Sequence, residues 1–211
     1  MIENIVYPAA IEIADNQDDR RTLILQAALS LFTTRGYFNT SVHDIRREAD
    51  VSIGSIYHYF KNKEAIAQAL YDGLIGNMAL AVEKAAREHR TAHDRCQAVI
   101  AYLYELTESS PEAMQFILYA RHREFLPGEK PICSSRPFEM MKTMVEDGID
   151  QGEIRDLEPM VAATSLFGGP IRMIYLRLDG VLKEPLPKHL EQTWQCAWRS
   201  VAATKALGSE A

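Results

Sequence analysis

The side chains best suited to chemistry lie between residues 40 and 64, and they are small, hydroxylic, aromatic or basic. The outward-facing set in its second half is Ser52, Ile53, Gly54, Ser55, Tyr57, His58, Lys61 and Lys63. Small side chains at the start of a short helix let its backbone approach a duplex closely. Hydroxyl, aromatic and ammonium groups can then contact phosphates or a thymine methyl group. The set therefore predicts contact with double-stranded DNA through the major groove.

Two short helices must position these side chains, and capping residues mark where each helix begins. Thr40 or Ser41 caps a helix over 42–49, and Asp44 stands three residues after Ser41, as in a capping box. Ser52 is the natural N-cap of a second helix over 53–60, reached through a three-residue turn. Two short helices joined in this way are the pattern of a helix-turn-helix.

Further phosphate contacts are predicted where these helices and the next one begin. Thr40 and Ser41 stand at the start of the helix over 42–49, and Arg46 either adds a phosphate contact or faces solvent. Asn62 caps the following helix, whose positive N-terminus lies beside Lys63.

This segment resembles the DNA-binding signature of the TetR family of transcriptional regulators. The matching pattern is Thr40-x4-Ile45-x3-Ala49-Asp50-Val51-Ser52-x-Gly54-x2-Tyr57-x2-Phe60-x2-Lys63-Glu64. The resemblance covers about residues 20–70, including Leu31-Phe32 and Arg35-Gly36-Tyr37. Asp50 stands where the family usually has glycine, and aspartate tolerates the left-handed backbone that the turn needs. Arg46 is a second departure, because the family usually has a small residue there.

The resemblance implies a homodimer with small DNA-binding heads, a helical ligand-binding body and dimerisation through the last two long helices. Helical spacing of apolar residues recurs along the whole chain, and no segment alternates as a strand does. We therefore expect an all-α, nine-helix TetR-like architecture. The expected helices are 20–35, 42–49, 53–60, 63–87, 92–109, 112–125, 137–152, 158–179 and 187–207. The expected organisation is a flexible N-terminal arm over 1–18, a helix-turn-helix domain over 19–66 and an effector-binding and dimerisation domain over 67–211.

Charge limits where DNA can bind. The 211-residue chain has a formal net charge of −6. Residues 18–64 hold seven basic and six acidic side chains, so the negative charge lies in the remainder, which should avoid DNA.

Three scattered cysteines form no disulfide or zinc pattern. The longest stretches without a charged residue have 13 residues, and the N-terminus lacks the basic region of a signal peptide. These features predict a cytoplasmic protein with no membrane partner.

The body offers candidates for ligand binding and dimerisation, although most of its large apolar residues are expected to be core. The predicted ligand-binding residues are Met114, Tyr119, His122, Phe138, Met141, Phe167 and Arg172. His122 is either a ligand contact or a satisfied core residue. Leu166, Trp194 and Trp198 are predicted in the dimer interface. Gly73 and Gly76 in the helix over 63–87 indicate a bend or a close helix crossing, and residues 168–170 indicate a kink.

The sequence predicts a regulator, most simply a repressor released from a palindromic operator by a small-molecule effector. A non-specific architectural DNA-binding protein is the alternative, and the acidic body disfavours it. A metal-dependent helical enzyme is a further alternative, based on His89, His93 and Cys96, but a solvated connector between two helices explains these residues better. No enzyme motif is present, and no cofactor or metal is predicted.

Overall fold

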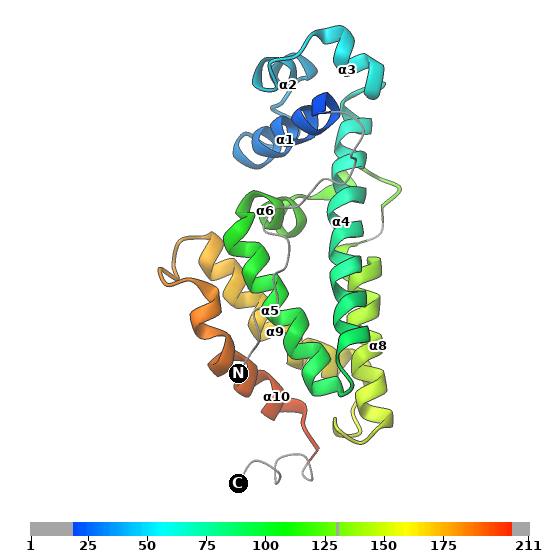
Figure 1. Ribbon diagram of the computed structural model, residues 1–211, viewed down its shortest axis with the longest axis vertical. Helices are drawn as coiled ribbons and strands as arrows, with labels where there is room; N and C mark the ends of the chain where they lie inside the picture. The colour runs from blue at the N-terminus through cyan, green and yellow to red at the C-terminus, as the bar shows by residue number, and fades with distance from the viewer. Residues whose placement is uncertain (1–18, 130, 204–211) are drawn as a thin grey trace. The chain divides into compact units, whose positions relative to one another are not determined.

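The computed structural model describes residues 19–129 and 131–203. In this part the chain is all-α, as predicted, with a single isolated bridge between Ile154 and Ala202 in place of any strand. The α-helices are α1 (Asp19–Thr34), α2 (Val42–Glu48), α3 (Ile53–Tyr59), α4 (Lys63–Glu88), α5 (Ala92–Ser109), α6 (Pro111–Tyr119), α7 (His122–Phe125), α8 (Arg136–Asp150), α9 (Pro159–Leu178) and α10 (Leu190–Val201) (Figure 1). Two 3-10 helices, η1 (Ile132–Ser134) and η2 (Leu186–His189), join them. The expected N-terminal arm, and the end of the last expected helix beyond residue 203, lie outside the described residues.

The described residues contain ten α-helices rather than nine, because the helix expected over 112–125 is broken. Ala120 has an extended backbone with ψ of 130°, and Arg121 is also outside the helical region. The break turns the chain so that His122 and Phe125 of α7 are both buried. The helical spacing in the sequence continues across the break, so it does not reveal the turn.

The chain divides into two compact units. The first contains residues 1–77 and 110–135, of which the structure describes α1–α3, the first half of α4, α6 and α7. The second contains residues 78–109 and 136–211, with the rest of α4, α5 and α8–α10. The first unit therefore extends beyond residue 66 and includes α6 and α7 together with the helix-turn-helix.

The core of the first unit holds α2 and α3 against α1. Ile24 and Leu25 of α1 are fully buried, as are Ile45 of α2 and Ile56 of α3. Asp50 in the turn between α2 and α3 has φ of +50°, which confirms that aspartate adopts the left-handed conformation there. These contacts fix the side of α3 that faces inward and therefore the side that faces outward.

Helix α4 belongs to both units and is the longest helix described. Among the described helices it alone is long and apolar enough to cross a bilayer, but the core helices of many proteins have the same length and composition. Ile66, Leu70 and Leu74 of α4 are buried within the protein. A Cβ added at Gly73 or Gly76 would meet no described atom within 4 Å. The expectation of a close helix crossing at these glycines is therefore wrong.

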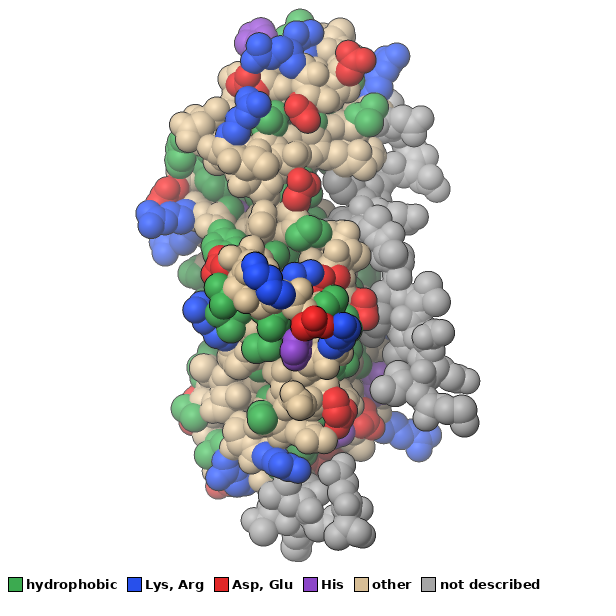
Figure 2. Space-filling model, turned by 90° about the vertical axis from the view of Figure 1, so that its left-hand side faces the viewer, with side chains coloured by type: hydrophobic (Ala, Val, Ile, Leu, Met, Phe, Trp, Pro, Cys, Tyr) green, Lys and Arg blue, Asp and Glu red, His purple; other side chains and the backbone are tan. Residues whose placement is uncertain are grey.

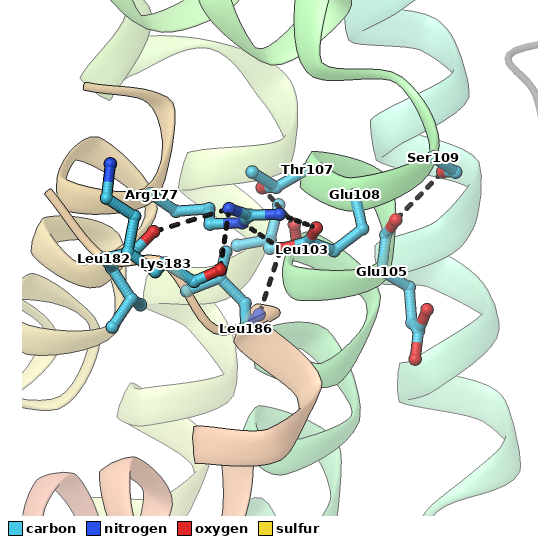
Figure 3. A network of polar contacts seen from close by, with 9 residues as sticks. All are labelled: Leu103, Glu105, Thr107, Glu108, Ser109, Arg177, Leu182, Lys183 and Leu186. Carbon is cyan, nitrogen blue, oxygen red and sulfur yellow. Dashed lines mark hydrogen bonds and ion pairs between the residues drawn. The ribbon is translucent and has the colours of Figure 1, made fainter. Parts of the chain in front are cut away.

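In the second unit, α9 packs against α10 and both pack against α5. A polar network at one end of this packing joins Glu108 of α5 to Arg177 of α9 and to the segment after it (Figure 3). The Glu153 carboxylate caps α5 by accepting hydrogen bonds from the Ala92 and His93 N–H groups at 2.9 and 3.1 Å. These contacts satisfy helix-end groups that would otherwise lack partners.

Candidate DNA-binding surface

The expected caps of α2 and α3 are present. The Ser41 hydroxyl accepts from the Asp44 N–H at 3.2 Å, and the Asp44 carboxylate accepts from the Ser41 N–H at 2.9 Å. Hydrogen bonds from Ser41 and Arg47 keep the pKa of Asp44 well below its usual range. The Ser52 hydroxyl accepts from the Ser55 N–H at 3.0 Å. Both short helices therefore begin where the sequence predicts.

The outer side of α3 carries the polar side chains that the sequence places there. Tyr57 is 55% exposed, and Ser52, Gly54 and His58 are exposed as well, whereas Ile53 and Ser55 are half-buried. A Cβ at Gly54 would meet only the Ser52 hydroxyl oxygen, at 3.7 Å, so the packing of the protein does not itself require glycine there. Figure 2 shows basic side chains and a histidine, with acidic ones among them, over the helices at the top of the view. The exposed set is thus compatible with close approach to a duplex.

Thr40 does not belong to this surface. It is 2% exposed, and its hydroxyl donates to the Gly36 carbonyl at 3.0 Å. The prediction that Thr40 contacts DNA is corrected for its side chain, because burial and this hydrogen bond make it part of the packing between α1 and α2. Ser41 beside it is exposed.

The two lysines at the start of α4 differ in their surroundings. Lys61 is exposed. The Lys63 ammonium instead donates to the Tyr37 carbonyl at 2.9 Å and to the Thr40 carbonyl at 2.8 Å. The expectation that Lys63 is exposed is therefore wrong. Arg46 is half-buried on α2.

The predicted ligand-binding residues are divided between the two units. In the first unit Met114 and His122 are buried and Tyr119 is exposed; in the second, Met141 and Phe167 are buried, Phe138 is half-buried and Arg172 is exposed. Neither unit by itself brings the whole set together.

His122 is the most unusual of these residues. It is 7% exposed, its ring lies 4.8–4.9 Å from the rings of Tyr71 and Phe116, and neither ring nitrogen has a described partner with ordinary hydrogen-bond geometry. Burial lowers its pKa, while the nearby carbonyls of Phe116 and Ile117 act in the opposite direction. His122 is therefore a core residue that is held neutral without being fully satisfied.

The residues predicted for the dimer interface are buried within one protomer. Leu166 and Trp194 are almost completely inaccessible, Trp198 is buried, and the Trp194 indole N–H donates to His93 Nε2 at 2.9 Å. The prediction is corrected, because these large side chains form the core between α5, α9 and α10. A groove of about 400 Å³ also lies along α9 and α10, and none of its residues is among those predicted for the interface. Most of its side chains are small, and its lining is Ser165, Gly169, Pro170, Met173, Gln192, Thr193, Cys196, Ala197 and Ser200.

The residues behind the metal alternative have other partners. His93 Nδ1 is 2.8 Å from the Asp94 carboxylate and its Nε2 accepts from Trp194, so both ring nitrogens are occupied. Burial raises the pKa of the Cys96 thiol to about 12. No group of three or more His, Cys, Asp or Glu side chains in the described ranges could hold a metal ion.

Comparison with known proteins matches this fold and surface. The family model for bacterial regulatory proteins of the tetR family matches residues 24–70. The chain is 27% identical over 171 residues to the uncharacterized HTH-type transcriptional regulator YhgD of Bacillus subtilis, covering 74% of this chain and 83% of that protein. It is 28% identical over 156 residues to the fatty acid metabolism regulator protein of the same organism, covering 69% and 76%. The crystal structure of the B. subtilis transcriptional regulator FadR in complex with stearoyl-CoA has a TM-score of 0.67 at 23% identity, covering 82% of this chain and 95% of that one.

The all-α fold with a capped helix-turn-helix near its start defines a DNA-binding regulator of transcription. The helix-turn-helix segment of this chain matches the TetR family of bacterial transcriptional regulators, and the relatives and fold of the chain are those of regulators rather than enzymes.

Proposed function

We propose that this protein is a homodimeric repressor that acts in the cytoplasm, binds a palindromic operator and is released by a small-molecule effector. The exposed polar side of α3, with Tyr57 and the small residues before it, is the observation that supports the proposal. Helix α3 has seven residues, so one copy reaches few bases. Two copies related by a two-fold axis would read half-sites one helical turn, ~34–36 Å, apart.

Selection from a random-sequence duplex library tests the DNA-binding part of this proposal. We expect one palindromic sequence to be enriched, and Tyr57→Phe to weaken its binding because an exposed hydroxyl that contacts the duplex is lost. Tyr119→Phe, which changes an exposed tyrosine of α6, serves as the control and should leave the affinity unchanged. Failure to enrich any sequence would favour the non-specific architectural alternative.

We place the dimer interface on the groove of small residues along α9 and α10. Small side chains let helices of two copies approach closely, and Met160 and Val161 at the start of α9 are exposed apolar residues. An obligate homodimer interface should bury more than ~2,000 Å² in total.

Substitution in the groove tests this placement. Gly169→Arg should give a monomer by analytical ultracentrifugation, because a long charged side chain would stand where two copies are proposed to approach closely. A Cβ at Gly169 meets no described atom within 4 Å, so the new side chain begins in open space within one protomer. In the native dimer, maleimide should modify Cys196 more slowly than Cys133, since both thiols are exposed in one protomer and only Cys196 lines the groove. Equal rates in a dimeric sample would contradict the placement.

The effector class that we propose is a long-chain acyl-CoA. The support is the similarity to the fatty acid metabolism regulator protein and to the FadR structure that contains stearoyl-CoA. Stearoyl-CoA should raise the melting temperature and release the selected duplex, with a stabilisation of about 2.7 kcal/mol at 100 times its Kd. Coenzyme A and stearate alone are the controls, and release by neither these nor stearoyl-CoA would exclude the class.

A further inference from the structure

Lys63 is half-buried at the point where α4 begins, and its ammonium group is directed to the protein backbone. It donates to the carbonyls of Tyr37 and Thr40, which are 26 and 23 residues away in the chain. It also lies 4.1 Å from the centre of the Tyr37 ring, in cation–π geometry. Partial burial lowers the pKa of Lys63, and the carboxylate of Glu64 opposes this shift. Two hydrogen bonds, a cation–π contact and the charge of Glu64 thus act on one side chain.

These contacts leave only one N–H donor of the Lys63 ammonium group for a second partner. An ammonium group has three N–H donors, and two of them are directed to backbone carbonyls. To reach a phosphate with its full hydrogen-bonding capacity, Lys63 would have to leave carbonyls that lie in the turn between two helices, where they would lose a partner.

The carbonyl acceptors stand at the entrance to the helix-turn-helix. Thr40 immediately precedes Ser41, the N-cap of α2, and Tyr37 begins the same turn. The two hydrogen bonds therefore join the start of α4 to the start of α2 and close the chain segment that contains α2 and α3. Tyr37 is itself held by Phe125 of α7, with the two rings stacked at 4.1 Å.

We propose that Lys63 is a positioning residue that holds α2 and α3 in their DNA-reading orientation at the start of α4, and that it does not bind a phosphate. Lys61, which is exposed two residues earlier, is then the phosphate-binding lysine of this junction. This inference rests on the proposed function, since it concerns how the same surface binds its operator.

Salt dependence of binding separates positioning from contact. Each phosphate contact contributes about 0.9 to the slope of log K against log salt, so loss of one contact in each protomer lowers the slope of the dimer by about 1.8. We expect Lys61→Met to lower the slope by this amount on the selected duplex. Lys63→Met should instead leave the slope unchanged and weaken binding about tenfold, as loss of hydrogen bonds from a charged donor would. Circular dichroism must show that each variant is folded at the assay temperature.

Two results with Lys63→Met would overturn the proposal. A slope lowered by about 1.8 would make Lys63 a phosphate contact. An unchanged affinity per folded dimer, with a lower melting temperature alone, would make its role purely structural. If no duplex is enriched in the selection, the proposed function has failed. The role of Lys63 can still be tested then, by measuring the same salt slopes on a random duplex and by lysine acylation.

Acylation of the unmodified protein provides a test that does not depend on any variant. An N-hydroxysuccinimide ester should modify Lys61 readily in the free dimer and poorly in the complex with DNA, as read by peptide mass spectrometry. Lys63 should react slowly in both samples, because its ammonium group is held by two carbonyls. Rapid reaction of Lys63 in the free dimer, followed by protection in the complex, would contradict the proposal even if Lys63→Met did not fold.

Discussion

Replacing Glu108 by glutamine should destabilise the second unit, because Glu108 accepts three hydrogen bonds at the end of α5 (Figure 3). Arg177 Nε and Nη2 each donate to its carboxylate at 2.8 Å, and the Leu186 N–H donates at 3.0 Å. Arg177 Nη1 also donates to the carbonyls of Leu182 and Lys183, at 3.4 and 3.3 Å. The pair therefore holds the segment that leads from α9 to α10.

The expected cost follows from the geometry and the exposure of the pair. Hydrogen bonds to charged groups contribute ~1.5–3 kcal/mol each when they are shielded from water. The side chains of Arg177 and Glu108 are 29% and 22% exposed, so solvent screening reduces this value. We expect Glu108→Gln to lower the free energy of unfolding by about 2 kcal/mol in total. For a chain of this length that is a fall of about 4–8 °C in melting temperature.

Calorimetric melting of wild type and variant measures this cost, and pH separates the charge from other effects. Hydrogen bonds from Arg177 outweigh burial and lower the pKa of Glu108. The stabilisation is therefore fully present above the unfolded value of about 4.3 and is lost as the pH falls through the lower folded value. Glu105→Gln, an exposed position on the same helix, is the matched control and should change stability by less than ~0.5 kcal/mol. Equal effects of the two variants, or a Glu108 effect that persists in acid, would refute the reasoning.

Two further predictions concern the packing of each unit. Because burial lowers the pKa of His122, its contribution to stability should be complete above about pH 6.5 and should be lost as the pH falls through the folded value. His122→Phe should flatten the stability profile in this range, and His43→Gln, at an exposed position of α2, should not. A Cβ at Gly148 would lie 2.7 Å from Ala92 Cβ and 2.8 Å from Ile154 Cδ1, so Gly148→Ala should cost ~1–3 kcal/mol. Gly76→Ala, in open space, should instead add up to ~1 kcal/mol of helix stability, and thermal denaturation of the two variants checks the contrast in sign.

The helix-turn-helix could be predicted from the sequence because local signals determine it. Ser41 and Ser52 cap their helices through residues three positions away, and Asp50 forms the turn between them. Each of these signals operates within one turn of helix. Once the caps fix the bounds of α3, its apolar residue Ile56 must face the core, and Ile56 is buried. The opposite side of α3 then faces outward.

Features that depend on distant contacts could not be predicted in the same way. An apolar stripe on a helix shows that one side is buried but not by what, so Trp194 and Trp198 fit a dimer interface as well as a protomer core. Their contact with His93, about a hundred residues earlier, decides the question in favour of the core. The break before α7 has a similar cause, since Phe125 turns inward to stack on Tyr37.

Lys63 shows why a well-matched motif still leaves the role of a residue open. A phosphate oxygen and a backbone carbonyl both accept hydrogen bonds from an ammonium group, so a lysine at a fixed position near a helix-turn-helix is consistent with either partner. The choice depends on whether the turn before α2 brings backbone carbonyls within reach of the Lys63 ammonium group. The Tyr37 carbonyl already accepts from the Thr40 N–H at 3.2 Å, and the turn brings it and the Thr40 carbonyl toward the start of α4. A side chain that the sequence places beside DNA thus has acceptors within the protein, as the proposed positioning role requires.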